Sequence, residues 1–144
     1  MEALTQSGRL SGRPAGCERL VSAPGIGPII STALTAAVGN GTGFQKGRDL
    51  AAWLGLVPRQ NSSGGKTTLL GISKRGNRYL RKLFVEGARS VFCRLNRKQH
   101  ALGNWMNQME ARKPSNLAVV ALANKLVRIA WAVLTTGQPY RAVA

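Results

Sequence analysis

Two adjacent serines, Ser62 and Ser63, lie in a polar, glycine-bearing stretch just before a dense run of basic residues. A hydroxyl in such a stretch can donate a hydrogen bond to a phosphate or, when activated, attack phosphorus. The basic residues that accompany the serines are Lys66, Lys74, Arg75, Arg78, Arg81 and Lys82. No carboxylate falls between Asp49 and Glu86. Since clustered Lys and Arg neutralise backbone phosphates, this stretch predicts a nucleic-acid-binding surface.

The whole chain is strongly basic, with 21 Lys and Arg against five Asp and Glu in 144 residues and a formal net charge of +16. This balance favours a polyanionic partner, DNA or RNA. A membrane surface is the competing partner, but the basic residues are spread over several segments instead of forming one amphipathic helix. The apolar run 117–134 contains Asn124, Lys125 and Arg128, which argues against a membrane span. Only two cysteines are present and no export signal is recognised, so we expect a cytoplasmic protein.

The sequence predicts two helices around a glycine turn in its first third. A short helix from Cys17 leads into Pro24-Gly25-Ile26-Gly27-Pro28, and an apolar, small-residue helix follows as far as Gly39. Such a helix-hairpin-helix can grip a phosphate through Gly25 and Gly27, because glycine lets the backbone approach closely at a helix start. The alternative is that the glycines only make a tight turn, with Ile26 in the core.

The serine stretch lies between two predicted helices. In the first helix, 48–56, Leu50, Trp53 and Leu54 are expected to pack inward. The second begins near 73–76, with Ser73 as its N-cap, and its apolar positions recur at helical spacing. Those positions are Leu80, Leu83, Phe84, Gly87, Ala88, Val91, Phe92 and Leu95. Its opposite face carries Arg78, Lys82 and Arg89, so the hydroxyl and guanidinium groups are expected to meet one phosphate.

The predicted fold is mainly α: a helix-hairpin-helix followed by a small helical bundle, with a glycine-rich loop or short β-hairpin near 59–72. Two further helices are expected at 96–113 and 115–136, the latter capped by Ser115 and closed by Gly137. We expect a disordered leader at 1–16, one domain at 17–139 and a short tail at 140–144.

Three segments resemble one known family. The segments PGIGPIISTALTAAVGNGTGF, GRDLAAWLGLVPRQNSSGGK and GISKRGNRYLRKLFVEGAR are similar to the C-terminal domain of bacterial insertion-sequence transposases and pilin-gene invertases. In that family this domain accompanies an N-terminal RuvC-like DEDD domain. The resemblance covers roughly 17–139, with several motifs in the family's order.

The resemblance implies a serine nucleophile at Ser62, with Ser63 as the alternative, that holds a DNA strand as a phosphoserine. Nearby Arg and Lys would stabilise the charge that develops on phosphorus. It also implies a DNA partner, a structured guide RNA in some members, and action as a multimer or with the DEDD half. That half would bind a divalent metal such as Mg²⁺, whereas no cofactor is expected in this chain.

The acidic residues of the chain are Glu2, Glu18, Asp49, Glu86 and Glu110. They are too scattered to build the family's metal-binding tetrad, so we expect a truncated transposase, or the separate C-terminal piece of one, that is inactive alone. The main alternative is a non-catalytic module in which the serines only bond to phosphates. A structural or ribosome-associated basic protein is a third possibility that rests on charge alone.

Overall fold

A computed structural model describes residues 15–63, 66–72 and 76–140 and has the mainly helical fold that the sequence predicts. The predicted leader therefore falls almost wholly outside the described residues, as does most of the predicted tail. The elements in chain order are α2 (Ala15–Val21), α3 (Pro28–Val38), α4 (Gly47–Trp53), β1 (Pro58–Ser63), β2 (Lys66–Ile72), α5 (Arg78–Arg94), α6 (Ala101–Arg112) and α7 (Ser115–Thr136).

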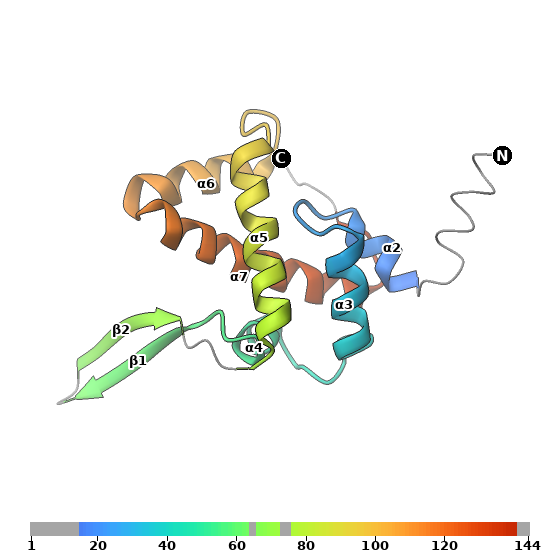
Figure 1. Cartoon of the computed structure of the whole chain (residues 1–144), viewed down its shortest axis with the longest axis horizontal. Helices are drawn as coiled ribbons and strands as arrows, with labels where there is room; N and C mark the ends of the chain where they lie inside the picture. The colour runs from blue at the N-terminus through green and yellow to red at the C-terminus, as the bar shows by residue number, and fades with distance from the viewer. Residues whose placement is uncertain (1–14, 64–65, 73–75, 141–144) are drawn as a thin grey trace.

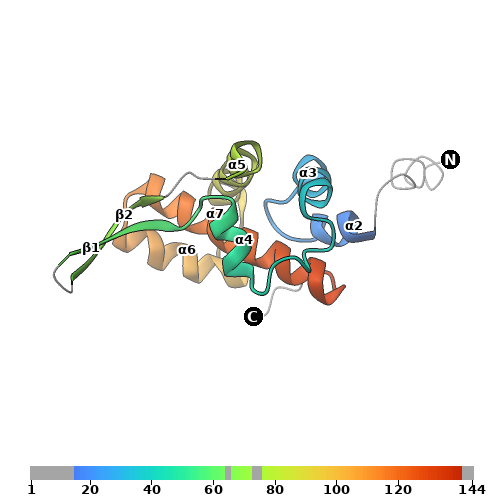
Figure 2. The ribbon, with the colours of Figure 1, turned by 90° about the horizontal axis from the view of Figure 1, so that it is seen from below.

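Helix α7 is the centre of the fold, and α2, α4, α5 and α6 all pack against it. Figure 1 shows α5 crossing α7, and Figure 2 shows α3 and α5 on one side of α7 with α6 on the other. By length and composition α7 could cross a membrane. However, Leu122, Leu126 and Val127 on α7 are fully buried against the other helices. We therefore describe α7 as the core helix of a folded domain.

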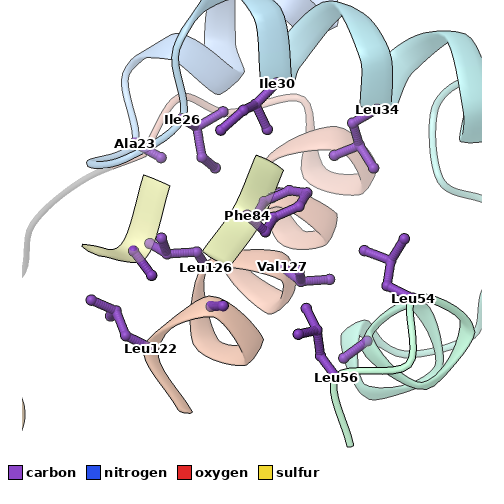
Figure 3. Close-up of a cluster of buried hydrophobic side chains, with 14 of the residues drawn as sticks. Ala23, Ile26, Ile30, Leu34, Leu54, Leu56, Phe84, Leu122, Leu126 and Val127 are labelled. Atoms are coloured by element: carbon purple, nitrogen blue, oxygen red, sulfur yellow. The ribbon is translucent and has the colours of Figure 1, made fainter. Parts of the chain in front are cut away.

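Helix α5 supplies the other large part of the core. Leu80, Phe84, Ala88 and Val91 are buried along one face, as the predicted apolar stripe requires. Figure 3 shows Phe84 among side chains from α3, from α7 and from the segment just after α4, which makes it the point where these parts of the chain meet. The amphipathic pattern of α5 was therefore a reliable guide to its orientation.

The N-terminal helices α2 and α3 are joined by the glycine turn at 22–27 and pack against α5 and α7. Ile26 from the turn and Ile30 from α3 point into the core, as Figure 3 shows. Pro28 opens α3, where its missing N–H is not needed, and Gly39 ends the helix with a φ of 61°. The predicted helix pair is thus present, while its use as a DNA-binding motif stays a prediction.

Strands β1 and β2 pair as an antiparallel β-hairpin, one of the two forms expected near 59–72. The register pairs Pro58 with Ile72 at the root and Ser63 with Lys66 at the far end. In Figures 1 and 2 the hairpin extends away from the helices. The serine stretch is therefore a projecting arm of the fold.

Three local predictions were wrong. Trp53 does not pack fully inward: it is 39% exposed, because the buried face of the short α4 is formed by Leu50 and Ala51. Helix α5 is capped by Asn77, whose side chain accepts a hydrogen bond from the Leu80 amide, so Ser73 is not its N-cap. The N-cap of α7 is Pro114, and Ser115 is already inside the helix.

Candidate nucleic-acid interface and serine hairpin

The start of α5 presents basic side chains to solvent. Arg78 and Lys82 are four residues apart, which places them on the same side of a helix. Both are exposed, and within the described part of the chain neither forms an ion pair. Further along, Arg89 is also exposed, with Glu86 at 3.4 Å. Arg78 and Lys82 are thus accessible to an anionic ligand, as the sequence predicts for them.

Arg81 occupies a different position on the same helix turn. It is half-buried, and its guanidinium donates a hydrogen bond of 3.2 Å to the carbonyl oxygen of Leu54 at the end of α4. Carbonyls at a helix C-terminus have no partner within the helix, so a cation there satisfies one of them. Arg81 therefore joins α5 to α4, a structural role that the sequence did not predict.

The backbone just before α5 closely approaches the backbone at the end of α4. A Cβ atom added at Gly76 would lie 1.7 Å from the carbonyl oxygen of Trp53, and Gly76 has a φ of 86°. Both facts require glycine at this position. Nearby, the side-chain amide of Asn124 on α7 donates a 3.0 Å hydrogen bond to the carbonyl oxygen of Leu56. The chain on both sides of the hairpin is therefore anchored to the helical body.

The hairpin carries Ser62 and Ser63 away from this anchored root. Ser62 lies four residues beyond Pro58, which corresponds to about 13 Å of extended strand. Its backbone partner is Thr67, while Ser63 is paired with Lys66. Cross-strand partners have Cβ atoms about 4.5–5.5 Å apart, so Lys66 is the predicted phosphate-binding residue nearest in register to a serine. Beyond this register, the side chains of the hairpin lie outside the described structure.

The far end of the hairpin, where Ser63 pairs with Lys66, extends away from the helical body that carries Arg78 and Lys82. The expectation that one phosphate meets the loop hydroxyl and the α5 guanidinium assumed a short loop folded over the helix. The hairpin extends away from the helices instead (Figure 1), and the expectation of one shared phosphate stays a prediction. Lys74 and Arg75, which were also predicted to contact phosphate, lie outside the described residues.

The two glycines of the α2–α3 turn have different surroundings. A Cβ added at Gly25 would lie 2.8 Å from the Val91 side chain and 3.0 Å from the Gly87 carbonyl oxygen. Gly25 therefore permits the turn to pack tightly on α5, which supports the packing alternative for this residue. A Cβ at Gly27 would meet no atom within 4 Å. Phosphate binding by these glycines stays a prediction, with open space for it at Gly27.

The carboxylates of the described residues are used locally and do not fit a metal site. Asp49 accepts a hydrogen bond from the Lys46 amide at the start of α4. Glu110 receives two hydrogen bonds of 2.7 Å from Arg97. These hydrogen bonds lower the pKa of Glu110 and raise that of Arg97. In the described part of the chain no three His, Cys, Asp or Glu side chains gather.

Gly76 and Asn124 are the positioning residues that sequence reasoning missed. Gly76 lay where the second helix was expected to begin, and no separate role was predicted for it. Asn124 interrupts an apolar helix, and it was used only as an argument against a membrane span. A polar side chain in the middle of a core helix was the available signal, because such a group needs a hydrogen-bond partner.

Comparisons with known proteins agree on one group of relatives. Residues 17–103 match the family model described as the transposase IS116/IS110/IS902 family. The chain is 47% identical over 127 residues to a probable family 20 transposase of Pseudomonas aeruginosa, which covers 88% of this chain and 38% of that protein. It is 48% identical over 120 residues to the transposase for insertion sequence element IS1328 of Yersinia enterocolitica, covering 83% of this chain and 36% of the relative.

A more distant relative is named for the inversion of a gene. The chain is 32% identical over 126 residues to a pilin gene-inverting protein of Moraxella bovis, covering 84% of this chain and 37% of the relative. The chain thus spans between 36% and 38% of the length of these three relatives.

Proposed function

Because this chain belongs to the IS116/IS110/IS902 family of transposases, we propose that it is the C-terminal, DNA-binding part of a DNA transposase or recombinase. Relatives named as transposases and as a pilin gene-inverting protein support DNA as the partner and DNA rearrangement as the process. The net charge of +16 supports the same partner on physical grounds. The protein would act in the cytoplasm, at the nucleoid.

In this proposal a serine of the hairpin, Ser62 or alternatively Ser63, is the nucleophile. Its hydroxyl oxygen attacks a DNA phosphodiester, a phosphorus–oxygen bond to the serine forms, and the bond from phosphorus to the leaving sugar oxygen breaks. The serine proton ends on that leaving oxygen. The phosphoserine keeps the energy of the diester, so a second sugar hydroxyl can displace the serine and rejoin the strand.

The observation that carries the proposal is the projecting hairpin with a fixed root. Gly76, Arg81 and Asn124 hold the chain on either side of the hairpin against α4, α5 and α7. Its far end, at Ser63 and Lys66, is directed away from the body. A nucleophile on such an arm can reach a phosphodiester that is bound by another subunit or another domain.

The remaining parts of the proposed enzyme come from outside this chain. A RuvC-like DEDD domain would hold the divalent metal, and this chain would be inactive without such a domain. The exposed cations Arg78 and Lys82 would bind DNA, and Gly27 and Lys66 would contact phosphates. Self-association and a structured guide RNA are further parts of the proposal that rest on the family resemblance.

A complementation experiment tests the nucleophile. The chain is mixed with Mg²⁺, labelled junction DNA that carries the element's ends, and the full-length Pseudomonas relative with its own aligned serines replaced by alanine. We expect a denaturant-resistant DNA adduct on this chain. Ser62→Ala should abolish it, while Ser115→Ala, which removes an exposed serine on α7, should leave it unchanged.

Each outcome has a definite meaning. Loss of the adduct in Ser63→Ala, with retention in Ser62→Ala, would move the nucleophile to Ser63. An adduct that survives both substitutions would exclude both serines. If the unsubstituted chain forms no adduct, the catalytic proposal is wrong for this chain.

The second candidate function is a non-catalytic nucleic-acid-binding module. The extension of the hairpin away from the helices supports it, because serines on such an arm and the cations of α5 would then bind different phosphates. In this case the serines would only donate hydrogen bonds to phosphates, and the salt-dependent binding expected of α5 would remain.

A further inference from the structure

An exposed aromatic ring lies among the cations at the start of α5. Tyr79 is 57% exposed. It directly follows Arg78 and precedes Lys82 by three residues, a spacing that makes Tyr79 and Lys82 neighbours on a helix surface. Leu80 and Phe84, on the other side of the helix, are buried in the core. The tyrosine ring is therefore held on the solvent side, beside two accessible positive charges.

The other aromatic rings of the described structure have partners, whereas Tyr79 has none there. Trp53 contacts Phe44 at a centroid distance of 5.7 Å, and Tyr140 stacks on His100 at 6.0 Å. Trp131 donates hydrogen bonds to loop carbonyls, and Lys125 lies over the Trp105 ring. Within the described residues, Tyr79 forms neither a hydrogen bond nor a ring contact. Nothing in the described fold thus requires a ring at this position.

We propose that the first turn of α5 binds an unpaired nucleotide, with the Tyr79 ring stacked on the base and Arg78 and Lys82 on the flanking phosphates. Aromatic rings flanked by cations are the usual platform for single-stranded nucleic acid, because every base has a face that can stack. In a duplex those faces are already covered by neighbouring base pairs. This inference rests on the proposed nucleic-acid surface of α5 and adds the kind of strand that it recognises.

The charge around Tyr79 distinguishes a nucleic-acid ligand from an apolar protein partner. Ile29 on α3 is 67% exposed, more than Tyr79, but α3 contains no Lys or Arg. Tyr79 has a cation on each side in the same helix turn. An exposed apolar group surrounded by positive charge complements a base with its phosphates better than it complements an apolar surface.

Fluorescence anisotropy with the full chain tests the stacking. The probes are a 12-nucleotide single-stranded DNA, its duplex, the same strand with abasic sites, and a single-stranded RNA of equal sequence. Tyr79→Ala should weaken binding of the single strand roughly thirtyfold, the middle of the range for one stacked base. Binding of the duplex and of the abasic strand should change less than twofold. Tyr79→Phe should bind as the unsubstituted chain does.

Ile29→Ala is the matched control, since it removes exposed apolar surface from a helix that contains no Lys or Arg, and it should change none of the affinities. Comparison of the DNA and RNA strands shows which nucleic acid supplies the base.

Equal weakening of all probes by Tyr79→Ala, or no weakening of any, would overturn the stacking proposal. Loss of affinity for every probe in Arg78→Ala would show at the same time that the α5 surface itself binds. If neither Arg78→Ala nor Lys82→Ala affects any probe, the proposed surface fails instead.

Discussion

Arg81 and Lys82 are adjacent cations with different surroundings, and the difference predicts different mutant behaviour. Arg81 is half-buried and donates to the Leu54 carbonyl, whereas Lys82 is exposed. Arg81→Ala should lower the free energy of unfolding by about 1 kcal/mol, because a buried carbonyl at the end of α4 loses a partner. Lys82→Ala should change it by less than about 0.5 kcal/mol, as is usual for surface substitutions.

Urea denaturation of the two variants measures the difference in their free energies of unfolding. Fluorescence anisotropy then measures how strongly each variant binds DNA. Lys82→Ala should bind more weakly while remaining as stable as the unsubstituted chain. If Arg81→Ala is equally stable and weakens binding to the same extent, then Arg81 belongs to the DNA surface and not to the α4–α5 junction. The sequence alone grouped both residues with the phosphate-binding cations, because residue type and spacing do not reveal which arginine faces a helix end.

At the scale of elements, the α4–α5 junction depends on Gly76. Its φ of 86° and the distance of 1.7 Å from an added Cβ to the Trp53 carbonyl oxygen leave no room for a side chain. Gly76→Ala should lower the free energy of unfolding by at least about 2 kcal/mol, since backbone strain and overpacking both contribute.

Gly43→Ala is the control for Gly76→Ala, because a Cβ there meets no atom within 4 Å. It should change stability little. Chemical denaturation of both variants gives the comparison, and limited proteolysis within 58–72 reports on the hairpin root. Equal stability of the two variants would mean that α4 and α5 do not approach each other as closely as described.

Elements with a strong local pattern could be predicted, and contacts between elements could not. The apolar spacing from Leu80 to Leu95 gave the buried face of α5, and Gly39 and Gly137 marked the ends of their helices. The cap of α5 was missed because both Ser73 and Asn77 are good N-cap residues, and the apolar pattern does not show that the helix begins only at Arg78.

Only part of the candidate site could be predicted, because its local pattern is visible in the sequence whereas its contacts between elements are not. The identity of its cations came from composition, and exposure of Arg78 and Lys82 followed from the helix pattern. The position of Ser62 did not follow, because it depends on whether 58–72 folds over α5 or extends as paired strands. That choice is made by the strand register and by anchors far away in sequence, such as Asn124 with Leu56.

At the scale of the whole molecule, the positive charge is unevenly arranged over the helices. α3 carries no basic residue, while α5 begins with three within five positions. A net charge of +16 guarantees some attraction to any polyanion, so affinity alone does not identify the binding face. The number of counterions released from DNA on binding is more informative, because it counts the phosphates that are neutralised.

The salt dependence of DNA binding should therefore locate the contact on the first turn of α5. Arg78→Ala and Lys82→Ala should each reduce the slope of log affinity against log salt by about one, and the double variant by about two. Lys98→Ala removes the same charge from an exposed position beyond the opposite end of α5 and should change the slope less. Anisotropy titrations at four salt concentrations provide the slopes. Equal reductions from Lys98 and Lys82 would indicate diffuse attraction to the whole chain, and the start of α5 would then have no special role in holding DNA.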